Sequence, residues 1–205
     1  GETGWHRGEV MPLLQKHWAA LGVPAAAKVF VPLCGKTLDM AWLAAQGHPV
    51  LGVELSQLAI AQFFDEHALT PDIRQSRYGT HYRAGAIEII HGDAFALDAH
   101  ALADCAAVFD RAALIALPPA LRQRYMGALY PQLPSACRGL LITLEYPQQD
   151  RDGPPFSVPE DEVRTGYGSH WDIALQERRS IPPEHPGFVN GASRVDTVVY
   201  ALHRR

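Results

Sequence analysis

The sequence predicts an α/β fold, a doubly wound and mostly parallel sheet of seven strands with helices on both faces and an antiparallel pair at one edge. Two observations lead to this prediction. Between residues 28 and 145, short apolar runs alternate with segments of helical character, as in a parallel sheet buried on both faces. Beyond residue 153, two runs alternate in polarity, which is typical of strands with one solvated face.

The first half of the chain predicts a regular succession of elements. Apolar residues recur at helical spacing from Val10 to Leu21, and Gly22 ends that helix. The strands of the parallel sheet are expected at residues 28–31, 50–54, 87–90, 106–109 and 139–145, with helices at 38–46, 56–67 and 118–133. Ser56 is suited to cap the second of these helices. Residues 74–86 are polar and predict an irregular connection or a weak hairpin.

The last third of the chain has a different character. Residues 153–156 open a loop, and the acidic turn 159–162 suits a helix N-terminus. The alternating runs 171–177 and 195–202 predict the antiparallel edge pair. Residues 180–193 between them exceed the length of a hairpin turn, and loops of this length are often lids or binding loops.

Length and composition indicate one domain covering residues 1–205. Its expected parts are an N-terminal segment and helix (1–22), a cofactor-binding sheet (28–145), and a loop with edge strands (153–205). The 205 residues carry 47% apolar side chains, which suffices for one core. With a net charge of −4 and basic residues scattered along the chain, neither nucleic acid nor a membrane surface is an expected partner, and we expect a monomer.

The three cysteines have no CxxC spacing, and we expect them in a reducing compartment. No apolar run approaches the ~20 residues of a membrane span, and no signal peptide opens the chain. A cytoplasmic protein is therefore expected. No carboxylate cluster suited to magnesium is evident in the sequence, and we expect no metal.

The strongest motif is the apolar run 29–33, which leads into the glycine turn at Gly35. It is followed, 19 residues after that glycine, by Glu54 at the end of a second apolar run. An apolar strand, a glycine turn, a helix and a second strand ending in a carboxylate are typical of a nucleotide-binding βαβ unit. The sequence therefore predicts a nucleoside cofactor.

Three cofactor classes fit a unit of this kind to different degrees. Residues 34–37 (CGKT) resemble the end of a P-loop, but Phe30 stands where a P-loop needs its first glycine. A nicotinamide site needs GxGxxG, whose outer positions are here Leu33 and Leu38. S-adenosylmethionine carries no phosphate, so Gly35 for the turn and Glu54 for the ribose hydroxyls meet its needs. The alternative is that Glu54 does not bind the ribose and is only an exposed carboxylate at the end of a strand.

Two further strand ends bear candidate site residues. Asp93, followed by Ala94, comes after the strand 87–90 and suits the adenine amino group, or else acts as a turn or helix-cap aspartate. Asp110 and Arg111 end the strand 106–109, where a methyl acceptor would meet the sulfonium. The Asp/Asn-Pro-Pro-aromatic motif of amino-methyltransferases is missing there, and a magnesium-binding carboxylate cluster was not found.

Together, these segments resemble the thiopurine S-methyltransferase family in its bacterial branch. The similarity rests on residues 31–36 (VPLCGK), 51–56 (LGVELS), 110–114 (DRAAL) and 153–156 (GPPF), with residues 3–6 (TGWH) similar to the start of that family. The resemblance spans essentially the whole chain. It implies a Rossmann-like enzyme that moves the methyl group of S-adenosylmethionine to a thiol or thione sulfur of a small aromatic or heterocyclic acceptor. Selenium and tellurium compounds are further candidate acceptors.

The resemblance also implies roles for individual residues. The cofactor contacts would be Trp5, Leu33, Gly35, Glu54, Asp93, Ala94 and Arg111, and the acceptor contacts Trp5, Arg111, Pro154 and Pro155. Each has a structural alternative: packing for Trp5, an ion pair with Asp110 or another acid for Arg111, and a stiff connection for the prolines. The second acceptor-binding arginine of the animal enzymes aligns near Pro186, with Arg194 nearby.

No catalytic base stands out among the ten histidines, and an ionised thiol needs none. The alternative functions are a cofactor-binding sensor without turnover and, as a lesser alternative, a nicotinamide-dependent oxidoreductase.

Overall fold

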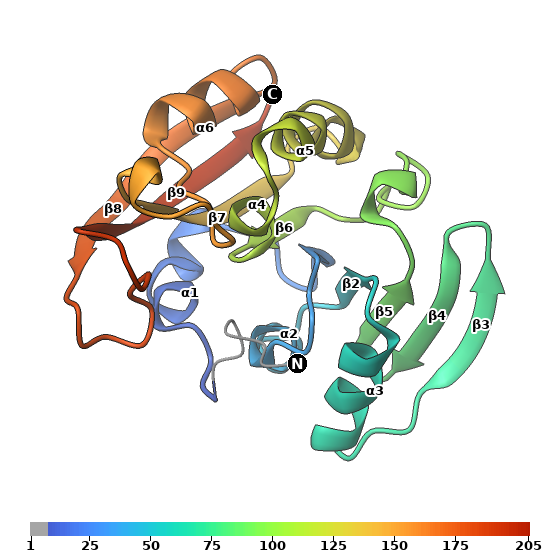
Figure 1. The fold of residues 1–205 in the computed structure, drawn as a ribbon. Coiled ribbons are helices and arrows are strands. Elements are labelled where there is room, and N and C mark those ends of the chain that lie inside the picture. The colour runs from blue at the N-terminus through green and yellow to red at the C-terminus, as the bar shows by residue number, and fades with distance from the viewer. Residues whose placement is uncertain (1–7) are drawn as a thin grey trace.

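The computed structural model, which describes residues 8–205, is built around a nine-stranded sheet in the order β3-β4-β5-β2-β1-β6-β7-β9-β8 (Figure 1). The strands are β1 (Val29–Pro32), β2 (Val50–Glu54), β3 (Asp72–Ser76), β4 (Gly79–Ala84), β5 (Ile87–His91), β6 (Ala107–Asp110), β7 (Arg138–Glu145), β8 (Trp171–Ile181) and β9 (Val195–Arg204). The strands β5, β2, β1, β6 and β7 are mutually parallel. The predicted doubly wound α/β fold is therefore confirmed.

The strand count is nine where the sequence predicted seven. The two additional strands, β3 and β4, form an antiparallel hairpin across residues 72–84, which the sequence left open as an irregular connection or a weak hairpin. Every residue of β3 is exposed, so its polar composition gives no apolar alternation to detect. The hairpin is held by backbone pairing with β5 and by buried His81, whose ring lies 2.6 Å from the Ser76 hydroxyl and 2.5 Å from Glu88.

At the opposite edge, β8 and β9 form the predicted antiparallel pair and β9 pairs with β7. The strand β8 runs on to Ile181, four residues beyond the predicted end, with a register shift between Leu175 and Glu177. The connection between β8 and β9 is therefore residues 182–194. Its length and position make it a wall of the site described below.

Helices cover both faces of the sheet (Figure 1). On one face lie α1 (Pro12–His17), α2 (Leu38–Ala45) and α3 (Gln57–Glu66), and on the other α4 (Ala113–Ala116), α5 (Pro119–Arg124) and α6 (Glu160–Tyr167). Single turns are η1 (Ala19–Leu21), η2 (Ala94–Ala96), η4 (Tyr130–Gln132) and η5 (Gln148–Asp150), and η3 (Tyr125–Leu129) is a π-helical segment. Ser56 caps α3, as predicted, by accepting a hydrogen bond from the Ala59 N–H.

The predicted helix over residues 118–133 is regular only as far as Arg124. It continues as the π-helical η3 and ends in η4, where Pro131 lacks the N–H that a regular helix would use. The irregular segment places the hydroxyls of Tyr125 and Tyr130 on the same buried carboxylate oxygen of Asp110. A buried polar contact thus sets the course of this helix, and helical periodicity alone does not report it.

The strands of the parallel sheet are apolar at nearly every position because each of their faces lies against a core. In β1, Phe30 belongs to the core under α4–α6, whereas Val29 and Val31 belong to the core under α1–α3. No helix among residues 8–205 has the length and apolar character needed to cross a membrane.

Gly52 in β2 allows the turn after β1 to approach the sheet. A Cβ atom at this position would lie 2.7 Å from the Cys34 sulfur and 3.2 Å from the Met40 sulfur. We therefore expect Gly52→Ala to lower the free energy of unfolding by about 1–3 kcal/mol, measured by urea denaturation. Gly127→Ala is the matched control, because a Cβ there has open space. In a Cys34→Ala background, Gly52→Ala should cost less; an equal cost would contradict the steric explanation.

Candidate active site

The candidate site lies where the parallel strands end. The strand β1 has β2 on one side and β6 on the other, so the order of the chain reverses at β1. In open parallel sheets, ligands bind beyond the carboxyl ends of the strands at such a point. The predicted residues Leu33, Gly35, Asp93, Ala94 and Arg111 lie in the connections that leave β1, β5 and β6, and Glu54 is the last residue of β2. The fold therefore brings these positions to one edge.

The carboxylate of Glu54 is held by two backbone N–H groups. Its Oε2 accepts from Gly35 N–H at 2.8 Å, and its Oε1 accepts from Ser56 N–H at 2.7 Å. Leu33 and Gly35 have positive φ angles of 47° and 53°, which fold the chain back sharply after β1. The turn thus fixes the orientation of a half-buried carboxylate at the end of β2.

Between these two residues, Cys34 points into the protein. Its N–H donates to the Val53 carbonyl at 3.0 Å, which extends the β1–β2 pairing, and its side chain is buried. Burial, with the nearby Glu54 charge as a second cause, raises the pKa of the Cys34 thiol well above its usual value. Cys34 is therefore a packing residue and not a nucleophile.

Asp93 and Ala94 follow β5. Asp93 is exposed and caps η2, where its Oδ1 accepts from the Phe95 N–H at 2.9 Å. The structure thus has the helix-cap contact that the sequence offered as the alternative, and the adenine contact stays a prediction. Ala94 is buried. Leu55, which directly follows Glu54, was not predicted as a site residue, and its side chain is 69% exposed.

Arg111, after β6, lies beside a buried acid that the sequence did not single out. Its Nη1 is 3.5 Å from Oδ2 of Asp39, in the first turn of α2. Asp39 also accepts from the Met11 N–H at 2.7 Å and from the Thr37 hydroxyl at 2.8 Å. The ion pair considered for Arg111 therefore exists, with Asp39 as the acid. Sequence reasoning did not identify Asp39, because an acidic residue in the first turn of a helix is common.

Asp110 points away from Arg111, into the core beneath α4 and α5. Its Oδ2 accepts from Tyr125 at 2.7 Å and from Tyr130 at 3.0 Å, and its Oδ1 from the Leu114 N–H at 3.4 Å. Burial raises the pKa of Asp110, although these hydrogen bonds oppose the shift. The pairing with Arg111 that the sequence allowed is wrong for Asp110, which has a structural role.

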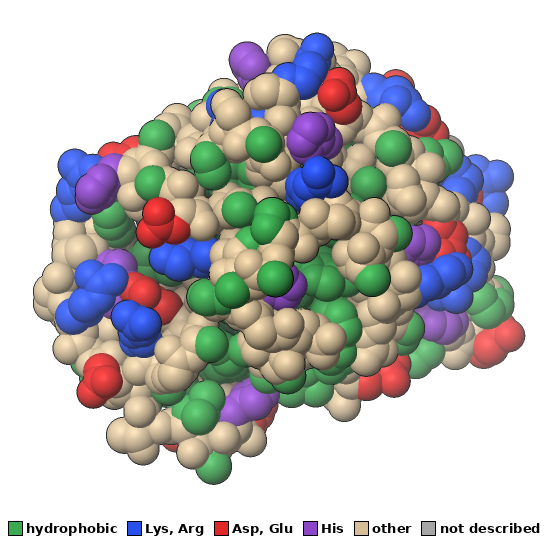
Figure 2. Space-filling view, turned by 180° about the vertical axis from the view of Figure 1, so that it is seen from behind, with side chains coloured by type: hydrophobic (Ala, Val, Ile, Leu, Met, Phe, Trp, Pro, Cys, Tyr) green, Lys and Arg blue, Asp and Glu red, His purple; other side chains and the backbone are tan. Residues whose placement is uncertain are grey.

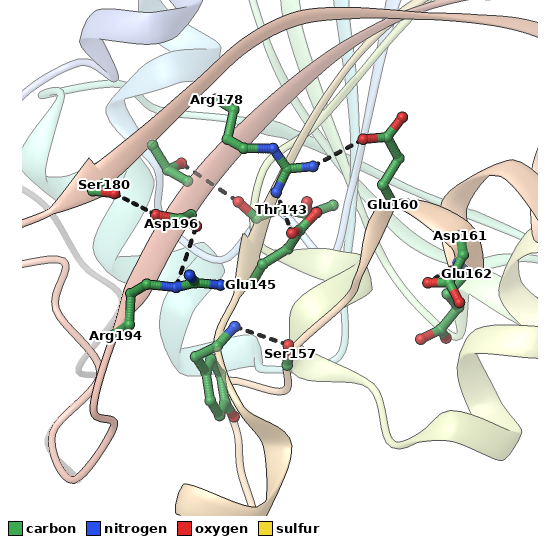
Figure 3. A network of polar contacts seen from close by, with 12 residues as sticks. Thr143, Glu145, Ser157, Glu160, Asp161, Glu162, Arg178, Ser180, Arg194 and Asp196 are labelled. Carbon is green, nitrogen blue, oxygen red and sulfur yellow. Dashed lines mark hydrogen bonds and ion pairs between the residues drawn. The ribbon is translucent and has the colours of Figure 1, made fainter.

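A cavity of about 850 Å³ opens beside Arg111. Its walls come from the start of α1, from β7, β8 and β9, and from the loops 151–155 and 185–190. Pro154, Pro155 and Pro186 line it together with Arg111. Trp5 lies outside the described residues. Arg194 does not line this cavity and is 3.7 Å from Asp196 (Figure 3).

Three basic side chains that the sequence did not single out also line the cavity: Arg151, Arg179 and His185. They come from separate segments, so no local motif could group them. Arg151 donates from Nη1 to the Asn190 carbonyl at 3.0 Å, and Asp150 accepts from the Ser193 N–H at 2.8 Å and hydroxyl at 2.7 Å. These hydrogen bonds join the loop 148–155 to the loop 182–194. Those from Ser193 also lower the pKa of Asp150.

Comparisons with known proteins show the family to which this chain belongs. The family model described as thiopurine S-methyltransferase matches residues 1–205. The chain belongs to the thiopurine S-methyltransferase family. Proteins named thiopurine S-methyltransferase from Xanthomonas campestris pv. campestris and Nitrosomonas eutropha are 59% and 58% identical to it, over all of this chain and 94% and 93% of theirs. One from Bordetella parapertussis is 55% identical over all of this chain and 94% of its own.

Solved structures show the same fold at low identity. The 1,6-didemethyltoxoflavin-N1-methyltransferase of Burkholderia thailandensis, with bound S-adenosylhomocysteine, has a TM-score of 0.61 and 18% identity, over 94% of this chain and 76% of its own. The N-methyltransferase NodS of Bradyrhizobium japonicum, also with S-adenosylhomocysteine, has a TM-score of 0.63 and 11% identity, over 94% and 88%. This member of the thiopurine S-methyltransferase family is an S-adenosylmethionine-dependent methyltransferase.

The turn after β1 fits that cofactor. A Cβ built on Gly35 meets nothing within 4 Å, so there is open space above the turn. Glu54 is only half-buried and offers carboxylate oxygens, which are acceptors suited to a pair of ribose hydroxyls. Because S-adenosylmethionine carries no phosphate, it requires neither a cluster of phosphate-binding glycines nor free backbone N–H groups.

The hydrogen bonds between the two loops lead to a prediction about the acceptor. Asp150→Ala removes both hydrogen bonds from Ser193, so the loop 182–194 should be held less firmly at the cavity. We expect KM for the acceptor to rise about 3- to 10-fold, with an unchanged Kd for S-adenosylmethionine. Steady-state kinetics and calorimetry measure the two quantities. The neighbouring Asp152→Ala is the control, and an equal effect of both substitutions would argue against the clamp.

Proposed function

We propose that this methyltransferase acts on a thiol or thione sulfur of a small aromatic or heterocyclic acceptor bound in the cavity beside Arg111. The observation that carries the proposal is the meeting of two features at one edge of the sheet. The turn with Gly35 and Glu54 ends β1 and β2, and the cavity begins at Arg111, after the adjacent strand β6. A flat, drug-sized acceptor suits a volume of about 850 Å³.

The cofactor residues are proposed from their places at that edge. Glu54 would accept from the ribose hydroxyls, Leu33 and Gly35 would line the methionine end, and Asp93 with Ala94 would meet the adenine. The exposed Leu55 gives an apolar surface beside Glu54 for the adenine ring. When bound, S-adenosylmethionine supplies a methyl group on a positively charged sulfur, which a nucleophile can displace in line.

Arg111 is proposed to hold the acceptor as its anion. A guanidinium close to a thiol favours the thiolate and so lowers the pKa of the thiol. The thiolate is already a strong nucleophile, so alignment replaces proton removal as the main task of the protein. Asp39 fixes the guanidinium from behind, because it is itself held by the Met11 N–H and the Thr37 hydroxyl.

Pro154 and Pro155 are proposed as a wall against the flat face of the acceptor. Their rings fix φ, so this wall has little freedom to collapse into the cavity. Trp5, predicted to cover both cofactor and acceptor, keeps that role as a proposal from the sequence. We further propose that the acceptor is a small molecule and that neither nucleic acid nor membrane is a partner. On the face shown in Figure 2, positive and negative side chains are intermixed.

A monomer in a reducing compartment such as the cytoplasm completes the proposal. Cys34, Cys105 and Cys137 are buried and unpaired, and burial raises the pKa of Cys105 and of Cys137 to about 12. Thiols of this kind are unreactive packing residues, and they suit a compartment in which no disulfide is needed.

The deciding experiment is transfer of labelled methyl from S-adenosylmethionine to a panel consisting of thiophenol, a heterocyclic thione, a selenol and tellurite. We expect label on the sulfur acceptors. Binding of the cofactor without transfer to any acceptor would favour the sensor. Thermal shift adds a second measurement, because cofactor at 100 times its Kd should stabilise the fold by about 2.7 kcal/mol. Stabilisation by NAD and not by S-adenosylmethionine would favour the oxidoreductase.

A further inference from the structure

We propose that the acceptor carries a carboxylate in addition to its sulfur, and that Arg179, assisted by His185 and Arg151, binds it at the end of the cavity opposite Arg111. This inference rests on the proposed function, since it concerns the same cavity. It adds a subsite that the sequence did not predict, because Arg179 belongs to the edge strand β8 and is far from every motif of the chain.

Arg179 is directed to the cavity by the register of the sheet. It lies opposite Thr197 of β9, which in turn lies opposite Leu144 of β7. These three residues form one row across neighbouring strands, and all three line the cavity. Side chains on one such row project from the same face of the sheet.

The adjacent residue, Arg178, shows the contrast. It projects from the other face of β8, where it is ion-paired with Glu145 and, at 2.9 Å, with Glu160 (Figure 3). Among the described residues, no carboxylate lies within ion-pair distance of the Arg179 guanidinium. One of two neighbouring arginines is thus ion-paired within the fold, and the other presents to the cavity a charge that has no carboxylate partner among residues 8–205.

The other polar groups of the cavity add to this positive character. Arg151 donates to a backbone carbonyl and has no carboxylate partner among residues 8–205. The Nδ1 atom of His185 accepts from the Gly187 N–H at 2.9 Å, so a neutral ring carries its proton on Nε2, as a donor. Glu9 is the one acidic residue among the described cavity-lining residues. Cavities lined by one sign of charge attract ligands of the opposite sign.

The distance between the two ends of the cavity determines which part of the acceptor each arginine can meet. Arg111 follows β6, and Arg179 lies in β8, three strands away in the order β6-β7-β9-β8. Neighbouring strands are about 4.8 Å apart, so the two backbones are separated by roughly 14 Å across the sheet. One guanidinium therefore faces the sulfur and the other the far end of a ring. An aromatic thiol with a carboxylate across the ring has this layout.

The first test uses the unaltered enzyme and two matched acceptors, 4-mercaptobenzoate and 4-mercaptobenzamide. They have similar shapes and differ in charge. We expect kcat/KM to be about 10- to 100-fold higher for the carboxylate, the range given by one hydrogen-bonded ion pair. We also expect benzoate to inhibit competitively against the acceptor much more strongly than benzamide. Equal values for the two acceptors, with both methylated, would overturn the anion subsite and leave the proposed function intact. Failure to methylate either one would count against both.

The second test assigns the subsite to Arg179. The ratio of kcat/KM for the carboxylate to that for the amide should fall by at least about tenfold in Arg179→Gln and be partly retained in Arg179→Lys. The control is Arg83→Gln, because Arg83 is exposed in β4, at the other end of the sheet, and also lacks an ion pair among the described residues. It should keep the ratio of the unaltered enzyme. A ratio that is unchanged in Arg179→Gln would overturn the assignment.

Discussion

Replacing Glu54 by alanine is expected to weaken S-adenosylmethionine binding by about 100-fold and to reduce kcat/KM by at least as much. Hydrogen bonds to a charged group contribute about 1.5–3 kcal/mol each, and the carboxylate is proposed to accept from two ribose hydroxyls. The substitution also removes the acceptor of the Gly35 and Ser56 N–H groups, so the turn after β1 loses its support. Calorimetric titration with S-adenosylmethionine and S-adenosylhomocysteine measures the effect.

Two controls separate ligand binding from local structure. Glu54→Gln keeps the shape of the side chain but turns its NH₂ group toward one of the two backbone N–H groups that donate to the carboxylate. This variant should therefore also bind S-adenosylmethionine weakly. Asp65→Ala removes an exposed acid of α3 and should leave both Kd and kcat/KM unchanged. The melting temperature without cofactor reports damage to the turn itself. A Kd for Glu54→Ala within threefold of the unaltered enzyme would contradict the assignment of Glu54 to the ribose.

The parallel part of the sheet could be predicted from the sequence because its strands are buried on both faces. Runs such as Val29–Pro32 then become apolar throughout, and the glycine turn and the carboxylate follow at fixed spacing. The hairpin β3–β4 could not be predicted with the same certainty, since its outer strand is wholly exposed and is stabilised by backbone pairing. Pairing of this kind leaves no apolar pattern in the sequence.

In the candidate site too, some residues can be predicted from local sequence and others cannot. Glu54 and Arg111 end apolar strands and can be found from local pattern. Asp39 and Arg179 acquire their positions only through tertiary structure: one faces Arg111 across 72 residues of sequence, and the other reaches the cavity through the pairing of β8 with β9. Local pattern also misleads at Asp110, which is adjacent to Arg111 in the sequence but whose side chain turns to the opposite core.

Asp110→Ala is expected to destabilise the fold by about 3–5 kcal/mol. The substitution leaves the Tyr125 and Tyr130 hydroxyls without their acceptor inside a fully buried cluster, and each such group costs about 1–3 kcal/mol. Urea denaturation measures the loss. In a Tyr125→Phe/Tyr130→Phe background, the same substitution should cost much less, because no hydroxyl is left unsatisfied. A cost that does not depend on the background would mean that the tyrosines do not carry the effect.

Asp110 should also leave a signature in the pH dependence of stability. Its pKa is raised in the folded protein by burial, so above the ordinary aspartate pKa of about 3.9 the native state still holds a proton that the unfolded state has lost. The contribution of Asp110 to stability is therefore complete below about pH 3.9 and is lost as the pH rises through the raised pKa.

Asp110→Asn cannot titrate, so the difference in unfolding free energy between the unaltered protein and this variant should shift in favour of the variant from pH 4 upward. Carboxylates whose pKa is lowered by partners, such as Glu88 and Glu177, act in the opposite direction in both proteins and cancel in the difference. A difference that stayed constant with pH would show that Asp110 ionises as readily in the folded state as in the unfolded one. A difference that moved in favour of the unaltered protein would show that its hydrogen bonds from the two tyrosines outweigh its burial.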